Sequence, residues 1–165
     1  MRNRVLTSIA LLAVLATPAH ASDLSYEAYI DSDKRIKCLY GYAADKTGNH
    51  DAAIRIFEDC IERWNDVYSM IWLAQIYETG VGVPRDLAYA TALMKRGAEQ
   101  EDDAGYSILA RYHYGRALYE GTGTETNMTE GLQWLKRAAR EGSVDAQQYL
   151  QLIEAAQPPA PTAAQ

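Results

Sequence analysis

The sequence predicts an all-α fold made of stacked helix-turn-helix repeats. The main observation is that residues 80–98 and 121–139 follow one pattern and align without a gap. The identical positions are Gly80 with Gly121, Gly82 with Gly123, Lys95 with Lys136, Arg96 with Arg137 and Ala98 with Ala139. Apolar residues before and within each block recur at the three- and four-residue spacing of an amphipathic helix. A period of about 40 residues is typical of arrays in which each repeat packs on the next.

The two ends of the chain predict export and a disordered tail. Residues 1–21 combine two arginines, a short apolar run and the small-residue sequence Ala19-His20-Ala21. This arrangement is typical of a signal peptide that is cleaved after Ala21, and it predicts a periplasmic protein. Residues 157–165 are rich in proline and alanine and lack large apolar side chains, so we expect them to be disordered.

The charge balance narrows the classes of partner. Residues 1–21 hold two of the 16 basic residues, so the rest of the chain has 14 basic and 22 acidic residues, a net charge of −8. An acidic surface disfavours binding to nucleic acids and to anionic membranes. No later apolar run is long enough to span a bilayer. We therefore expect a protein partner, and one of basic character.

The repeat pattern divides the chain into units. We expect an N-terminal segment over 22–33, three units over 34–65, 66–101 and 102–143, and a capping helix over 144–156. In the second unit, Gly80 and Gly82 end the first helix, because glycine adopts the left-handed conformation of a helix exit. Asp86 is the expected N-cap of the second helix.

The first helix of the third unit aligns differently from the second. Its apolar residues match the second unit at an offset of 35 residues, with Tyr112 opposite Tyr77, whereas the second helices match at 41. The difference implies six extra residues between Tyr112 and Gly121. Two interpretations remain open, a longer helix or a longer loop. Insertions in repeat proteins often lie on one face and serve binding.

The position of the two cysteines predicts a disulfide. Cys38 and Cys60 lie symmetrically about residue 49, the centre of the turn expected at Gly48-Asn49 in the first unit. Residues equidistant from the turn of an antiparallel hairpin face each other, and an exported protein matures in an oxidising compartment. A redox centre is disfavoured, since the spacing is not Cys-x-x-Cys.

The units resemble the Sel-one-like repeat family, which is related to the tetratricopeptide repeat. The second unit matches the family pattern at Leu73, Tyr77, Gly80, Gly82, Val83, Asp86, Ala90 and Ala98. The third unit matches it at Tyr112, Gly121, Gly123, Asn127, Trp134, Ala138 and Ala139. The resemblance covers about residues 34–155. It implies a right-handed α-solenoid whose first helices line a concave groove, and a scaffold or adaptor for protein partners.

By analogy with the groove positions of that family, eight residues are expected to bind a partner. Five lie on first helices, namely Tyr42, Tyr68, Gln75, Tyr106 and His113, and the extra residues after Tyr112 add Tyr114, Arg116 and Tyr119. Tyrosine and arginine suit such a surface, because they dominate binding hot spots. Tyr77 and Tyr112 occupy framework positions of the repeat and are expected to lie in the core.

The absence of catalytic motifs from the sequence favours a non-enzymatic scaffold without a cofactor or metal. The sequence has no His-Glu-x-x-His, Gly-x-Ser-x-Gly or Ser-x-x-Lys motif. Two alternatives remain, because exported family members are linked to immunity against toxins and one cysteine-rich branch to penicillin binding. The chain would then be an immunity protein that neutralises a toxin, or a cell-wall or β-lactam hydrolase. The candidate general base of such a hydrolase is His113, although an ordinary half-exposed helix residue is the favoured interpretation.

Overall fold

The computed structural model describes residues 25–156, which form eight α-helices and no β-strand. The helices are α1 (Glu27–Ile30), α2 (Lys37–Lys46), α3 (His50–Trp64), α4 (Val67–Thr79), α5 (Leu87–Ala98), α6 (Tyr106–Glu120), α7 (Met128–Arg140) and α8 (Val144–Ala156). The predicted signal peptide over 1–21 and the predicted disordered tail over 157–165 lie outside the described residues. The all-α fold class expected from the sequence is confirmed.

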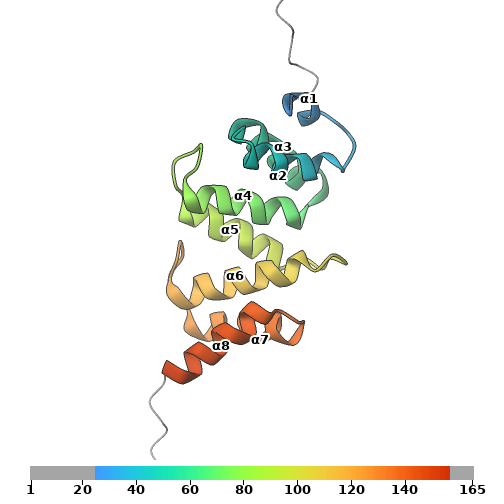
Figure 1. The fold of residues 1–165 in the computed structure, drawn as a ribbon. Helices are drawn as coiled ribbons and strands as arrows, with labels where there is room; N and C mark the ends of the chain where they lie inside the picture. Colours follow the sequence, from blue (N-terminus) through green and yellow to red (C-terminus); the bar gives the residue numbers. More distant parts are fainter. Residues whose placement is uncertain (1–24, 157–165) are drawn as a thin grey trace, which may run out of the picture.

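The helices stack in one direction, from α1 at the top of Figure 1 to α8 at the bottom. Three hairpins, α2–α3, α4–α5 and α6–α7, succeed one another, and α8 packs on α7. Contacts between α2 and α4, and between α4 and α6, place the first helices of the hairpins side by side. The α4–α5 and α6–α7 loops project on one side of the stack and the α5–α6 loop on the other (Figure 1). This arrangement is an α-solenoid.

Glycines and short polar side chains set the ends of the helices. Gly80 ends α4 and Gly121 ends α6, both in the left-handed conformation, with φ of 73° and 75°. The predicted N-cap Asp86 is confirmed, since its carboxylate accepts a hydrogen bond from a backbone N–H in the first turn of α5. The side-chain amide oxygen of Asn127 accepts the corresponding hydrogen bond from the backbone N–H of Glu130 in α7. The two loops therefore share one design.

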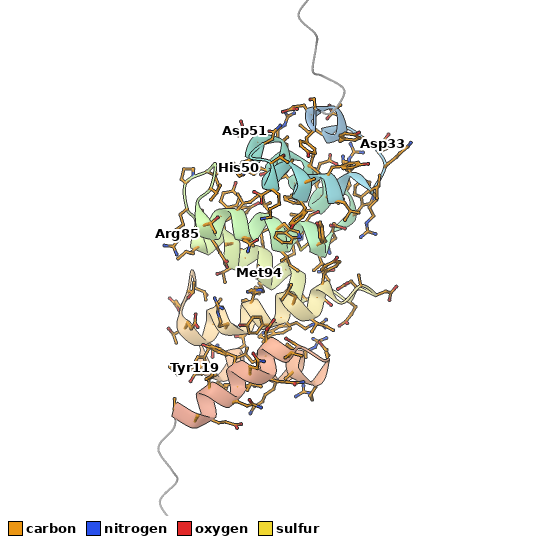
Figure 2. All side chains as sticks on the ribbon, viewed as in Figure 1. Asp33, His50, Asp51, Arg85, Met94 and Tyr119 are labelled. Carbon is orange, nitrogen blue, oxygen red and sulfur yellow. A yellow bond between two sulfur atoms is a disulfide. The ribbon has the colours of Figure 1, made fainter. Side chains whose placement is uncertain are left out.

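The second glycine of each loop packs against the preceding repeat. Gly82 and Gly123 have φ of 77° and 67°. A Cβ atom on Gly82 would overlap the side chain of His50, at the start of α3 (Figure 2), and one on Gly123 would overlap the carbonyl oxygen of Leu87, at the start of α5. These glycines thus allow each loop to contact the second helix of the repeat before it.

One offset relates the second and third repeats throughout, which corrects the alignment expected for their first helices. The N–H of Asp86 donates to the carbonyl oxygen of Tyr77 at 2.9 Å, and the N–H of Asn127 donates to that of Leu118 at 2.8 Å. Donors and acceptors of these two hydrogen bonds are each 41 residues apart. Leu118, and not Tyr112, is therefore the counterpart of Tyr77.

The extra residues of the third repeat consequently precede its first helix instead of following Tyr112. Residues 99–105 connect α5 to α6, whereas only residues 65–66 connect α3 to α4. Helix α6 runs without a break from Tyr106 to Glu120, so the segment after Tyr112 is ordinary helix that ends at the expected glycine. The longer connection is the feature that distinguishes this repeat, and it borders the cleft described below.

The first hairpin is closed by a disulfide between Cys38 of α2 and Cys60 of α3, as the sequence predicts. The two Cα atoms are 6.0 Å apart, and both side chains are buried. Close approach of the two helices also depends on Gly41, because a Cβ atom there would lie 2.6 Å from the ring of Phe57.

Candidate partner-binding face

Four aromatic side chains form a continuous row across the first helices of three repeats. We call Tyr42 of α2, Trp72 and Tyr68 of α4, and Tyr106 of α6 the aromatic row. Ring centroids are 4.5 Å apart for Tyr42 and Trp72, 6.1 Å for Trp72 and Tyr68, and 5.2 Å for Tyr68 and Tyr106. Tyr42 and Tyr106 at the two ends are each 37% exposed, and the two central rings are half-buried.

The aromatic row contains three of the residues expected from the sequence and one that was missed. Tyr42, Tyr68 and Tyr106 were expected on this face, and the structure brings them together. Trp72 was not expected there, although it follows Tyr68 by four residues and so shares its helix face. Gln75, a further expected residue, lies three residues beyond Trp72 and is exposed. Local helical spacing was the signal that could have found Trp72.

The chemistry of the aromatic row is that of an apolar surface with polar tips. Burial, together with the neighbouring phenol of Tyr106, raises the pKa of Tyr68 to about 12, so its hydroxyl remains protonated and neutral. The ammonium group of Lys46 lies 5.3 Å from the ring centre of Tyr42 and 5.0 Å from that of Trp72. The rings of Tyr42 and Trp72 therefore already make cation–π contacts with Lys46.

One end of the aromatic row opens into a cleft of about 830 Å³. Its lining comes from the start of α2, the α3–α4 connection and the α5–α6 loop. The residues are Arg35, Ile36, Cys38, Leu39, Trp64, Asn65, Asp66, Val67, Tyr68, Gln100, Glu101, Asp102, Asp103, Ala104 and Tyr106. Ile36 and Leu39 are more than half exposed there. The cleft thus joins an apolar wall to a wall rich in carboxylates.

A buried arginine holds the α5–α6 loop in place. Arg111 of α6 is 2% exposed, and its guanidinium donates to the carbonyl oxygens of Ala98 at 3.0 Å and Gln100 at 2.6 Å. It also pairs with Glu101 at 2.9 Å and with Glu141 at 2.6 Å. A planar guanidinium can satisfy several acceptors at once, which makes it suited to fix an irregular segment. Arg111 belongs to none of the sequence motifs described above.

The end of the same loop is fixed by a helix cap. Asp102 accepts hydrogen bonds from the backbone N–H groups of Tyr106, at 3.0 Å, and of Ser107. Burial acts to raise the pKa of Asp102, but these N–H donors outweigh it and bring the pKa below its usual value. The carboxylate therefore stays ionised at neutral pH, and the acidic wall keeps its charge.

A second group of aromatic residues lies between α6 and α8. Tyr149 of α8 contacts Tyr112 and Tyr119 of α6, with ring centroids 6.4 and 6.2 Å apart. Its hydroxyl donates to the carboxylate of Glu120 at 2.7 Å. Tyr119 lies toward the end of α6 away from the α5–α6 loop (Figure 2). The guanidinium of Arg116 lies 6.0 Å from the ring of Tyr112. These contacts connect the last helix to the third repeat.

Two residues expected to bind a partner lie in less accessible surroundings. Tyr114 is 5% exposed and packs on Trp134 of α7, 5.7 Å between ring centroids, which corrects its placement on the binding surface. The offset of 41 explains this, since Tyr114 is the counterpart of the buried Leu73. His113 is half-buried, and burial, with the nearby charge of Arg116, lowers its pKa to about 4. The imidazole is therefore neutral at pH 7.

The framework tyrosines are only partly buried, which differs from the expected core position. Tyr77 packs against the core and against Tyr89, 4.7 Å between ring centroids, but keeps part of its surface exposed. Tyr112 is half-buried against Tyr149.

Over residues 25–156 no three His, Cys, Asp or Glu side chains are grouped as metal ligands, and no helix in that span is long and apolar enough to cross a membrane.

The stacked hairpins define a class of protein, the α-solenoid of helical repeats. A scan against protein-family models finds the Sel1 repeat at residues 67–102 and 108–143, so this chain carries two Sel1 repeats. The two matched segments start 41 residues apart, in agreement with the offset in the structure.

A solved structure supports the same fold. The crystal structure of a Sel1 repeat protein from Oxalobacter formigenes is similar with a TM-score of 0.62 and 23% sequence identity, and the match covers 76% of this chain and 94% of that chain. No curated protein gives a significant match to the sequence.

Proposed function

We propose that the protein is a non-enzymatic scaffold of the periplasm that holds a segment of an envelope or secreted protein on the aromatic row. Sel1 repeats generally mediate protein–protein interaction, and this chain carries two of them. The observation that carries the proposal is the row itself, which crosses three repeats and is exposed at Tyr42 and Tyr106. Clustered, partly exposed tyrosine and tryptophan side chains are typical of binding hot spots.

Two features support the periplasm as the compartment. The first is the sequence of residues 1–21, which has the basic, apolar and small-residue parts of a signal peptide. The second is the disulfide between Cys38 and Cys60, a bond that persists mainly in oxidising compartments.

Site-specific crosslinking tests the proposal. A photo-reactive amino acid at Gln75, which is exposed beside Trp72, should give a covalent adduct with an envelope or secreted protein in intact cells. The matched control is the same amino acid at Gln133, which is exposed on the second helix α7 and should give no adduct. Trp72→Ala should reduce the Gln75 adduct, because it removes the centre of the aromatic row.

The comparison of these variants distinguishes a specific binding surface from non-specific binding. Equal adducts at Gln75 and Gln133, or an adduct at Gln75 that Trp72→Ala leaves unchanged, contradict the proposal. Adducts confined to cytoplasmic proteins would contradict the periplasmic location while leaving the binding surface in place.

A further inference from the structure

We propose that the cleft between α2 and the α5–α6 loop binds a cationic peptide segment that carries an apolar side chain beside its basic residue. This inference rests on the proposed function, since it names the kind of partner segment that the scaffold takes. It concerns a different part of the surface from Gln75, so the two can be tested separately.

The apolar part of the cleft suits an aliphatic side chain. Ile36 and Leu39 are 54% and 51% exposed on one wall. Tyr68 and Tyr106 contact each other at 5.2 Å between ring centroids and form the adjoining surface. Large apolar side chains exposed next to one another around a cleft of about 830 Å³ are typical of a ligand-binding surface.

The charge of the lining favours a cation. Four acidic residues, Asp66, Glu101, Asp102 and Asp103, line the cleft against a single basic one, Arg35. That arginine is already paired with Asp66 at 2.9 Å. The two lining carboxylates that make no ion pair with a described residue, Asp102 and Asp103, both lie on the α5–α6 loop, so the unbalanced negative charge is concentrated there.

The three carboxylates of that loop differ in whether they already bind other groups of the protein. Glu101 pairs with Arg111 at 2.9 Å and with Arg137 at 2.6 Å. Asp102 caps α6. Asp103 is exposed and makes no ion pair with any described residue, so it is the carboxylate most open to an incoming guanidinium or ammonium group.

The acidic wall is built before any ligand arrives. Arg111 binds the carbonyl oxygens of Ala98 and Gln100 on either side of the start of the loop, and the Asp102 cap fixes its end. A segment that is held in its binding conformation loses less entropy on binding. The extra length of this connection relative to residues 65–66 thus provides a fixed acidic wall that a shorter connection would lack.

Fluorescence anisotropy with three labelled peptides tests this inference. The first peptide alternates arginine and leucine, the second alternates glutamate and leucine, and the third alternates arginine and serine. We expect the arginine–leucine peptide to bind at least about tenfold more tightly than either of the others, because only it satisfies both walls. Its affinity should also fall as salt is added, since the carboxylates are exposed to solvent.

A pair of variants with the same change in charge locates the binding. Asp103→Asn should weaken the arginine–leucine peptide by up to about fivefold, the range expected for one exposed ion pair. The matched control is Asp51→Asn, an exposed carboxylate on the opposite side of the molecule from the α5–α6 loop (Figure 2), which should leave the affinity unchanged.

Three results would overturn the inference. These are equal affinities for the arginine–leucine and glutamate–leucine peptides, equal effects of Asp103→Asn and Asp51→Asn, or a dimer of this chain that the peptide dissociates, which would assign the cleft to a second copy. If any of them is found while the Gln75 adduct persists, the scaffold stands and only the cationic specificity fails. If the Gln75 adduct is lost while the arginine–leucine peptide still binds, the scaffold proposal fails and the cationic specificity of the cleft stands.

Discussion

Gly123 shows how a single residue can hold two repeats together. Its backbone lies against the carbonyl oxygen of Leu87 with a φ of 67°, so an added methyl group would meet both a backbone clash and an unfavourable conformation. Gly123→Ala should therefore lower the free energy of unfolding by about 3 kcal/mol. Urea denaturation of the purified protein measures this change.

Gly48→Ala is the control for Gly123→Ala, because it separates the two causes. Gly48 also has a positive φ, 87°, but nothing lies within 4 Å of a Cβ atom placed on it. Its replacement should lower the free energy of unfolding by only about 1 kcal/mol. Equal losses for the two variants would show that the contact with Leu87 contributes nothing.

His113 provides a prediction about pH. Its pKa is about 4 in the folded protein, because burial and the charge of Arg116 disfavour the protonated ring, and it is ordinarily 6.5. The unfolded chain then binds more protons between pH 6.5 and pH 4, so the folded state loses stability as the pH falls through that window. Between pH 7 and pH 5 the loss should be about 2 kcal/mol.

Two measurements check the prediction for His113. His113→Gln should reduce the difference in unfolding free energy between pH 7 and pH 5, because glutamine does not titrate. An NMR titration of the His113 ring in the wild-type protein should give a midpoint near 4. A midpoint near the ordinary value of 6.5 would mean that the ring is hydrated and that Arg116 does not influence it.

At the scale of single elements, the sequence predicts what is decided locally. Gly80 ends α4 and Asp86 starts α5 because a glycine exit and a carboxylate cap act within a few residues of their own position. The pairing of Cys38 with Cys60 was also predictable, since both cysteines are equally distant from a recognisable turn. The core of each hairpin follows the same helical periodicity.

The register of α6 could not be predicted in that way. Tyr112 resembles Tyr77 in type, and α6 is flanked by other helices on several sides, so its apolar residues do not define one face. A buried arginine occupies the position that Met70 holds in α4, 41 residues earlier. The partners of a buried charged residue come from other parts of the chain, so no local sequence pattern predicts its position.

The candidate site was half predictable for the same reason. The family resemblance implies that Tyr42, Tyr68 and Tyr106 lie on one surface, and the aromatic row contains all three. The cleft was missed, because its walls come from α2 and from a loop more than sixty residues later in the chain. Asp103 could be distinguished from the other carboxylates only in the structure, which shows the ones that are already paired.

At the scale of the whole molecule, stability should differ along the stack. Each hairpin contacts only its neighbours, and the disulfide lies in the first hairpin alone. A crosslink that closes 22 residues of sequence stabilises its hairpin by about 3 kcal/mol. Reduction of the disulfide should therefore accelerate amide hydrogen exchange in α2 and α3, by a factor on the order of 100, and leave α7 nearly unchanged.

Hydrogen exchange of the oxidised and reduced wild-type protein measures this gradient without any substitution in the core. The comparison at α7 is the internal control, because Met128–Arg140 lies four helices away from α3 along the chain. Equal acceleration in α3 and α7 would mean that the repeats unfold as one cooperative unit. The expectation that stability differs along the stack would then be wrong. Acceleration limited to the first hairpin would mean that the cleft, which α2 borders, loosens on reduction while the third repeat remains folded.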